Sequence, residues 1–526
     1  MTGGEPDTER PSTPATPATR AAFDTGQLRK DLRGRAVRGG AAAIVAQAAK
    51  FALIFGSTLI LARLLTPEDF GLVGMIHPVT AFVWLMRDLG LSTATVQRED
   101  LEERQVNALF WINVLVSVGL GVLVAALSPA VAAFYGDERL VWITVALAST
   151  MVLGGVASQH QALLRREMRF LEIGVIEVLG LAIGFASAVV AALQGLEYWA
   201  LVINIAVRET LISLMLMVRS GWRPSMPGHL KSATEMLRFG WYLAGAKFLE
   251  YSTRNVDTIL VGKFWGSGPL GLYNVAYRLL LLPIQQVNGP LGIVAVPILS
   301  RLQHDPERYR RFYRQGMLLL TSASMPLVML TAATAERMVV VLAGGQWREA
   351  TPIFLALAPA AWVGSFNVAT GWVFVSNGRT DRQLAMKCVT VPIIIAGIAI
   401  GVPHGPIGAA IGYSIGAVLV RPFAVLWCFR GTPLRFGDLV SALARPTLAG
   451  LLAGGGTAWL SREIAAPVES IPALLLVVAM FSVGYLAAWI GLPGGVRRFR
   501  ECLSLVDEFR RSRRSAVAPA TEEGTP

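Results

Sequence analysis

Fourteen apolar runs of about 20 residues divide this chain, and no other feature constrains its fold as strongly. A helix of that length crosses the hydrocarbon core of a bilayer, which is about 30 Å thick. Because lipid offers the backbone no hydrogen-bond partners, each run is expected to form a helix. The runs lie near residues 41–64, 71–96, 107–128, 139–158, 171–193, 198–218, 238–264, 270–298, 315–334, 351–375, 384–403, 405–429, 443–461 and 470–492. The pattern predicts an all-α polytopic membrane protein with about 14 transmembrane helices, although the two runs on either side of His404 could merge.

The composition agrees with a membrane protein and argues against several other classes. Hydrophobic residues make up 54% of the chain and charged residues 16%, against about 25% charged in an ordinary soluble domain. The net charge of +12 is spread over the segments between the apolar runs, so we expect no nucleic-acid partner. Of the three cysteines, Cys388 and Cys428 lie in apolar runs and Cys502 in the basic tail. This distribution gives no disulfide framework.

Basic residues alternate between the connections that join the runs. The even-numbered connections carry 20 lysines and arginines, whereas the odd-numbered connections carry four. The larger set is Arg98, Arg104, Arg165, Arg166, Arg169, Arg219, Arg223, Lys231, Arg238, Arg301, Arg308, Arg310, Arg311, Arg314, Arg379, Arg382, Lys387, Arg430, Arg435 and Arg445, and the smaller set is Arg139, Arg337, Arg348 and Arg462. Because basic loops stay in the cytoplasm, the alternation predicts that both termini are cytoplasmic. The longest external loop, near residues 335–350, is expected to hold an interfacial turn.

An internal repeat relates two sets of six runs. At an offset of 200 residues, Arg63 aligns with Lys263 and Gly71 with Gly271, and an offset of 213 aligns a further set of glycines and arginines. Since six spans is an even number, the two copies should have the same orientation and a pseudo-twofold axis along the membrane normal. The expected units are a disordered cytoplasmic N-terminal tail (1–35), an N-lobe (36–220), a C-lobe (236–430), helices 13 and 14 (440–492) and a basic cytoplasmic C-terminal tail (493–526).

The seventh run carries four charges on one face. Lys247, Glu250, Arg254 and Asp257 are spaced 3, 4 and 3 residues apart, so they share one side of a helix and alternate in sign. A lone charge in hydrocarbon costs at least about 3 kcal/mol, so this face must contact protein or a water-filled cavity. An alternating ladder can also neutralise itself, and a purely structural role is equally consistent with the spacing. Asp257 is in addition a candidate for binding a coupling cation.

Further charges lie deep within other runs. They are Lys50, Arg87, Asp88, Glu177, Arg208, Glu209, Arg278 and Arg421. If the adjacent pairs in the second and sixth runs neutralise each other, the remainder is positive, which favours an anion such as a diphosphate in a cavity between the lobes. Adjacent residues point to different sides of a helix, so we expect the partners of those pairs on other helices. The alternative is that all these groups form structural ion pairs.

No catalytic motif occurs in the chain. There is no GxxxxGK[ST] loop, GxSxG elbow or HExxH pair, and the five histidines have no ligand spacing. We therefore expect a transporter without catalytic residues, metal site or cofactor.

Three segments carry a resemblance to a known family. ILARLLTPEDFGLVGM, RDLGLSTATVQRED and RNVDTILVGKFWGSGPLGLYNVAYRL resemble the Wzx-type polysaccharide flippases of the multidrug/oligosaccharidyl-lipid/polysaccharide exporter superfamily, in the branch of the colanic acid exporter. The resemblance implies a flippase in the bacterial plasma membrane that moves undecaprenyl-diphosphate-linked oligosaccharide repeat units from the inner to the outer leaflet by alternating access. It further implies coupling to a proton or sodium gradient, contact with membrane lipids, and a polysaccharide polymerase and assembly proteins as partners.

The resemblance also implies roles for individual residues. It matches Lys50, Arg87, Arg254 and Arg278 to the cationic positions of the family's central cavity. With Arg208 and Arg421, chosen for their depth in the runs, these are the expected substrate-binding cations. From the face of the seventh run, Lys247, Glu250 and Asp257 are the expected gating or ion-coupling residues. In the related lipid II flippases, helices 13 and 14 form a groove for the lipid tail, and this chain has such a pair of helices.

Three alternatives remain open at this stage. A multidrug exporter of the same superfamily carries cations and should have an acidic cavity, whereas the charges here leave a basic one. A membrane polysaccharide polymerase or ligase usually has a large external loop, whereas all external loops here are short. A scaffold subunit without transport activity is the third.

Overall fold

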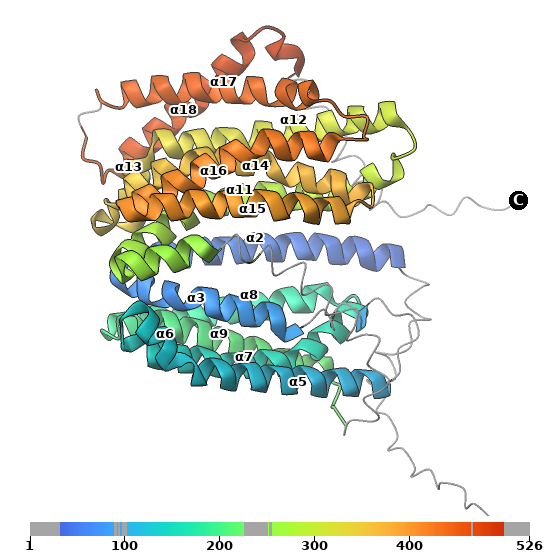
Figure 1. Cartoon of the computed structure of the whole chain (residues 1–526), viewed down its shortest axis with the longest axis vertical. Helices are drawn as coiled ribbons and strands as arrows, with labels where there is room; N and C mark the ends of the chain where they lie inside the picture. Colours follow the sequence, from blue (N-terminus) through green and yellow to red (C-terminus); the bar gives the residue numbers. More distant parts are fainter. Residues whose placement is uncertain are drawn as a thin grey trace, which may run out of the picture.

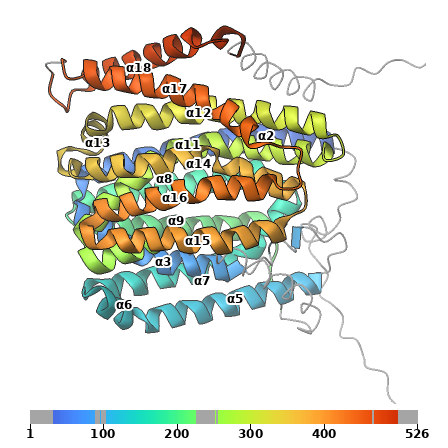
Figure 2. The ribbon, with the colours of Figure 1, turned by 45° about the horizontal axis from the view of Figure 1, so that its top comes forward.

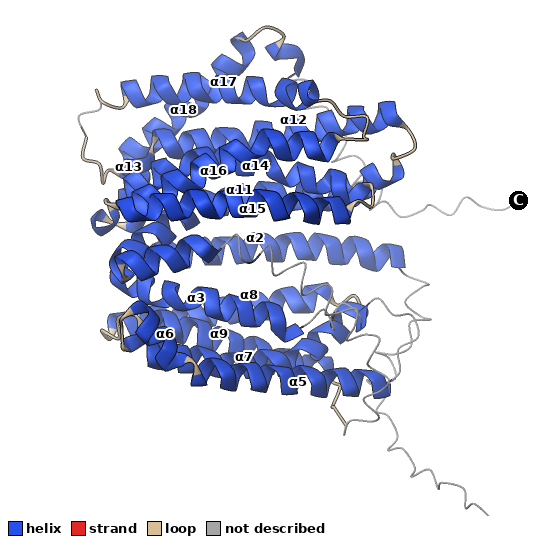
Figure 3. Ribbon diagram, in the orientation of Figure 1, coloured by secondary structure: helices blue, strands red, loops and turns tan. Residues whose placement is uncertain are grey.

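The helices of this protein are arranged in two halves along its longest axis (Figure 1). The computed structural model describes residues 32–88, 92, 95–96, 103–225, 251, 255–463 and 466–498. Within these residues the regular secondary structure is entirely helical, without strands (Figure 3). The predicted all-α class is confirmed.

The N-terminal half contains α2 (Leu32–Leu64), α3 (Pro67–Asp88), α5 (Glu103–Ala126), α6 (Ser128–Tyr135), α7 (Arg139–Arg166), α8 (Phe170–Leu193) and α9 (Trp199–Ser220). The C-terminal half contains a helical stretch at 255–265, then α11 (Ser267–Arg301), α12 (Pro306–Ala333), α13 (Ala335–Ala343), η3 (Gly345–Trp347), α14 (Ala350–Ser376), α15 (Thr380–Gly401), η4 (Val402–His404), α16 (Gly405–Phe429), α17 (Phe436–Leu460) and α18 (Ile471–Gly491). Figure 2 shows that α17 and α18 lie at the outer edge of this half, next to α12.

Ten helical segments among the described residues are long and apolar enough to cross a membrane. One of them, Thr380–Phe429, combines α15, η4 and α16. These two helices form a hairpin, because a Cβ atom on Gly397 would lie only 2.5 Å from the carbonyl oxygen of Gly412. The runs on either side of His404 are therefore two helices packed side by side, not one.

The number of spans is not settled at fourteen. Both α3 and α17 have the length of a span, with 22 and 25 residues, but they are not among the ten segments. Most of the seventh predicted run, 238–264, lies outside the described residues. The count of fourteen stays a prediction.

Large apolar side chains point outward along the spans. Leu115 is 74% exposed, Val218 78% and Leu419 66%, and they belong to three different helices. In water such a surface would be unfavourable, whereas in a bilayer it contacts lipid tails. Together with the ten segments, this surface identifies a multi-pass membrane protein.

The molecule has two distinct ends. At the short-helix end, on the left of Figure 1, lie α6 and α13 together with the turn between α2 and α3. At the basic end lie the connections that carry most of the loop arginines, including those between α7 and α8 and between α11 and α12. The turn expected near residues 335–350 is confirmed as α13 and η3, whereas α6 was not predicted.

The two halves touch where α3 crosses α11. A Cβ atom on Gly71 would lie 1.7 Å from the carbonyl oxygen of Ser267, and one on Gly271 would lie 1.8 Å from that of Pro67. These residues are offset by 200 positions, so each contact is the counterpart of the other. Such reciprocity is the property of a twofold interface. We call these four residues the glycine crossing, and they support the repeat inferred from the sequence.

At the short-helix end, each half supplies one cation that binds the end of a short helix in the other half. Arg63, at the end of α2, donates hydrogen bonds to the carbonyl oxygens of Val341 and, at 3.5 Å, of Leu342 in the last turn of α13. Lys263 donates to the carbonyl oxygen of Phe134 in the last turn of α6 and lies 4.9 Å from the centre of its ring. The last carbonyls of a helix lack partners and carry partial negative charge, so these crossed caps satisfy both helix ends.

An ion pair fastens α17 to α12 at the basic end. Arg310 donates to both carboxylate oxygens of Asp438, with Nε–Oδ2 at 2.7 Å and Nη2–Oδ1 at 2.9 Å. Asp438 also accepts from the backbone N–H of Arg435, which caps the start of α17. Although burial opposes ionisation, the hydrogen bonds from Arg310 and Arg435 hold the pKa of Asp438 below its usual value.

Acid should weaken this attachment. Because the pKa of Asp438 is lowered in the folded protein, its contribution to stability is present above its unfolded pKa of about 4 and is lost as the pH falls through the folded pKa. We expect Asp438→Asn to lower the thermal unfolding midpoint at pH 7 by a few degrees and to make that midpoint less sensitive to pH below 4. A midpoint equal to the wild type at pH 7 would contradict this role. Asp381→Asn, at an exposed site in the first turn of α15, is the matched control.

Candidate functional site

The candidate site is a group of polar side chains where the two halves face each other, and Arg278 of α11 is its centre. Arg278 lies eleven residues into α11, about 16 Å from the start of the helix. Its side chain is surrounded by protein and nevertheless keeps an accessible surface.

The neighbours of Arg278 come from the opposite half. Its Nη1 lies 3.4 Å from Oγ1 of Thr58 on α2, and its charge acts on the guanidinium of Arg208 on α9 and on the imidazole of His77 on α3. Like Arg278, His77 keeps an accessible surface although many protein atoms surround it. Among the described residues, no carboxylate forms an ion pair with Arg278. The site therefore holds a cation facing other basic groups, an arrangement that an anion would stabilise.

Lys50 of α2 is engaged by a carboxylate. Its Nζ lies 2.6 Å from Oε2 of Glu177 on α8, and the two side chains are 24% and 25% exposed. Gln161 of α7 donates to the other oxygen of Glu177 at 3.4 Å. The two residues are 127 positions apart in the sequence, and their charges neutralise each other. In this structure Lys50 therefore forms a structural ion pair between helices, as the alternative interpretation predicted.

The ion-pair partner of Arg208 differs from the prediction. Its partner is the adjacent residue, since Nη2 lies 3.0 Å from Oε1 of Glu209, and not a group on another helix. The long arginine side chain can turn sideways along the helix surface, which the positions of the two Cα atoms alone do not reveal. Arg208 still interacts with the charge of Arg278, so it belongs both to this pair and to the site.

Arg421 lies elsewhere, within the C-terminal half. It donates a hydrogen bond to Oδ1 of Asn367 on α14, and its guanidinium lies 6.0 Å from the ring centre of Phe366. Its Nε is buried without a hydrogen-bond partner among the described residues. The structure does not bring Arg421 into contact with Arg278.

Asp257 is the one member of the helix 7 face whose side chain is described. It is 4% exposed, and Oδ2 accepts from the hydroxyl of Tyr273 at 2.9 Å while Oδ1 accepts from the backbone N–H of Thr258 at 2.8 Å. These donors are neutral, so the hydrogen bonds shown do not require a neighbouring cation. Four other predicted site residues lie outside the part of the chain with described side chains: Arg87, Lys247, Glu250 and Arg254.

Sequence reasoning did not identify Thr58 and His77 as site residues. Thr58 has no charge to mark it, and His77 was set aside because the histidines lack metal-ligand spacing. Among the described residues, no group of three or more histidine, cysteine, aspartate or glutamate side chains could hold a metal ion.

Comparisons with known proteins assign the chain to a protein family. A family model described as "Polysaccharide biosynthesis protein" matches residues 60–352, which is more than half of the sequence and includes α3, the glycine crossing and Arg278. The chain belongs to this family. The resemblance predicted from the three sequence segments is confirmed.

Relatives of this family have names that concern polysaccharides. The teichuronic acid biosynthesis protein TuaB of Bacillus subtilis is 28% identical over 61% of this chain and 67% of its own length. The succinoglycan biosynthesis transport protein ExoT of Rhizobium meliloti is 24% identical over 91% of this chain and 96% of its own.

A solved structure shows the same fold. The lipid II flippase MurJ, in an inward closed conformation, superposes with a TM-score of 0.69 over 85% of this chain and 98% of its own, at 13% sequence identity. The two chains therefore share one fold over most of their length.

Proposed function

We propose that this protein is a flippase for undecaprenyl-diphosphate-linked oligosaccharide repeat units, which it moves from the inner to the outer leaflet of the bacterial plasma membrane. The observation that carries the proposal is Arg278, an accessible cation in the middle of a helix, at the boundary between the halves. Family membership supports this class of cargo, since the relatives are named for polysaccharide biosynthesis and transport.

The chemistry of the cargo fits that of the site. A diphosphate carries negative charge that hydrocarbon would exclude, and guanidinium groups bind phosphate through paired hydrogen bonds. Arg278 faces Arg208 of the other half, so a bound diphosphate would reduce the repulsion between these two cations. A cationic drug would increase that repulsion, which argues against the multidrug alternative.

Alternating access follows from the contacts at the short-helix end. If the basic end is cytoplasmic, as the loop arginines predict, then the glycine crossing and the crossed caps close the external side. Translocation would then separate α3 from α11 and release Arg63 and Lys263 from the helix ends that they cap. The same reciprocal geometry allows the halves to rock about the pseudo-twofold axis.

Asp257 is the proposed point of ion coupling. A buried carboxylate whose described donors are neutral, among them the Tyr273 hydroxyl and the backbone N–H of Thr258, can take up a proton or a small cation at modest cost. The driving force would be a proton or sodium gradient, and no cofactor would take part. A polysaccharide polymerase and its assembly proteins are the proposed partners that receive the cargo in the outer leaflet.

Lipid analysis of a deletion strain tests the proposal. Loss of a flippase should leave intact lipid-linked repeat units on the cytoplasmic face, because synthesis continues while transfer stops. The units can be extracted and located by their resistance to a glycosidase added outside intact spheroplasts. Unpolymerised units already exposed in the outer leaflet would contradict flipping and would point to a polymerase or ligase. Plasmid-borne wild-type protein should restore export, which controls for effects on neighbouring genes.

A further inference from the structure

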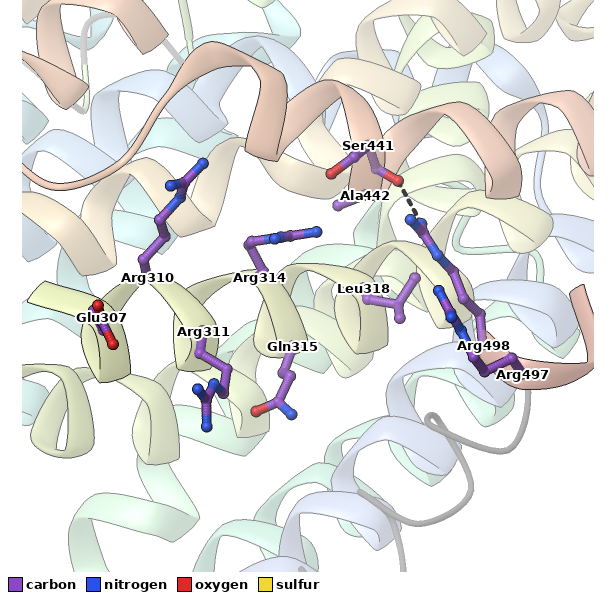
Figure 4. A pocket seen from close by; sticks show the side chains of 10 residues that line it. All are labelled: Glu307, Arg310, Arg311, Arg314, Gln315, Leu318, Ser441, Ala442, Arg497 and Arg498. Atoms are coloured by element: carbon purple, nitrogen blue, oxygen red, sulfur yellow. Dashed lines mark hydrogen bonds between the residues drawn. The ribbon is translucent and has the colours of Figure 1, made fainter. Parts of the chain in front are cut away.

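A second group of basic residues lies at the basic end, on α12, on α17 and in the segment after α18 (Figure 4). It surrounds a pocket of about 560 Å³ between α12, α17 and the segment that follows α18. Five arginines line this pocket: Arg310, Arg311, Arg314, Arg497 and Arg498. We call it the arginine pocket.

The charges of the arginine pocket do not balance. Glu307 is the one acidic residue that lines it, and Asp438 stands beside it as the shared partner of Arg310 and Arg314. Arg497 has an interaction of its own. The other four arginines face these two carboxylates and leave a surplus of two positive charges. Like charges at this spacing repel one another unless an anion or solvent counter-ions lie between them.

Arg311 is available to such an anion. Figure 4 shows Arg310 and Arg314 pointing from α12 toward α17, whereas Arg311 and Gln315 point to another side of the same helix. Arg311 is exposed and has no hydrogen-bond or ion-pair partner among the described residues. Arg498 closes the opposite side of the pocket and donates to the carbonyl oxygen of Ser441 at 2.8 Å.

The guanidinium of Arg445, a partly buried residue, gives a further sign of a missing anion. Arg445 of α17 has two guanidinium nitrogens, Nε and Nη1, that are buried without partners among the described residues. The charge of Arg498 acts on it from close by. Its Nη2 donates to the carbonyl oxygen of Pro493, but the two buried nitrogens without partners are costly, and a second cation nearby adds to that cost. An anion bound near these two residues would lower it.

Apolar side chains lie on the side of the arginine pocket that is formed by Leu318 and Gln315 of α12. Leu318 lines the inner wall. Gln315 also borders a separate small crevice between α11, α12 and α14, whose other walls include Leu291, Phe312 and Trp372. Arg311 and Gln315 are four residues apart and so lie one above the other on α12. A ligand held by Arg311 would therefore place its adjoining part next to the apolar crevice.

We propose that the arginine pocket binds the phosphate headgroup of a membrane lipid, with the start of the lipid chain lying against the apolar side chains beside Gln315. Guanidinium groups bind phosphate oxygens in pairs, and both cationic and apolar walls are present at this site. The assignment is one of binding chemistry and does not rest on the proposed function. It applies to a polyprenyl diphosphate and to an anionic phospholipid alike, and the experiment separates these two sources.

Binding to the purified full-length protein tests the proposal. Native mass spectrometry in neutral detergent would follow titration with geranylgeranyl diphosphate, dioctanoyl phosphatidylglycerol or inorganic pyrophosphate. The pocket variant is Arg311→Gln with Arg497→Gln. The matched control is Arg301→Gln with Arg382→Gln, which removes two exposed arginines at the same end outside the pocket. We expect the pocket variant to bind at least one of the two lipids about tenfold more weakly than wild type, since charge-assisted hydrogen bonds to phosphate are lost.

Each outcome has a defined meaning. Preference for the prenyl diphosphate assigns the pocket to the lipid carrier, and equal or stronger binding of phosphatidylglycerol assigns it to a leaflet lipid. Unchanged affinity in the pocket variant would overturn the proposal, as would an equal loss in the control. Pyrophosphate binding as tightly as either lipid would overturn the lipid assignment. If the double variant does not fold, Arg311→Gln alone gives the same comparison, because that side chain is exposed.

Discussion

Replacing Arg278 with alanine is expected to abolish polysaccharide export while leaving the protein in the membrane. Arg278 lies where the halves meet, keeps an accessible surface, and forms no ion pair among the described residues that its removal would break. Two charge-assisted hydrogen bonds to a phosphate are together worth about 3 kcal/mol or more, which corresponds to a loss of export of about 100-fold. Export would be measured as polymer released by a deletion strain that expresses the variant.

Two matched variants make this result specific. Arg301→Ala removes an exposed arginine at the end of the same helix and should leave export unchanged. Arg278→Lys keeps the charge but loses the planar fork, so it should retain part of the activity. Wild-type export by well-folded Arg278→Ala would contradict the assignment of Arg278 to the substrate.

Adding a methyl group at the glycine crossing is expected to block transport in a different way. A Cβ atom at Gly71 or Gly271 would lie less than 2 Å from a backbone carbonyl oxygen of the opposite half. No side-chain movement can relieve a contact with backbone, so α3 and α11 must separate. We expect Gly71→Ala with Gly271→Ala to reduce export about tenfold or more and to shift the protein toward a state open at the short-helix end.

The separation can be measured with spin labels. Glu138→Cys and Glu349→Cys place labels on exposed sites at the short-helix end of each half, in a chain whose three cysteines are replaced by alanine. The distribution of distances between them should move to longer values in the glycine variants. Gly119→Ala is the control, because a Cβ atom there would meet nothing within 4 Å. An unchanged distribution together with normal export would show that the crossing does not close the external side.

Much of the fold could be predicted because a bilayer restricts the chain to few solutions. Apolar runs of span length predicted helices, and the alignment of Gly71 with Gly271 predicted two related halves. The helix α6 was missed, since its eight residues have no polarity pattern that separates them from the end of α5. The seventh span could not be compared, because most of it lies outside the described residues.

The site was predicted less completely, because contacts between distant residues decide it. The depth of Arg278 in its run identified it as a candidate. The partner of Lys50 could not be predicted, since Glu177 lies 127 positions away and only the packing of α2 against α8 brings the two together. The arginines of the arginine pocket were interpreted as a sign of membrane orientation alone, because a loop sequence does not reveal which side chains converge.

The crossed caps have a consequence for how this protein opens. Arg63 and Lys263 each hold a helix end of the opposite half, so the closure behaves as the interface of a homodimer contained within one polypeptide. A duplicated gene can alter the two copies independently, and here one copy carries arginine and the other lysine. Because guanidinium and ammonium groups bind carbonyl oxygens with different strength and geometry, the two sides of the closure need not be released together. Divergence between two once-identical contacts would thereby give a symmetric architecture a preferred order of opening.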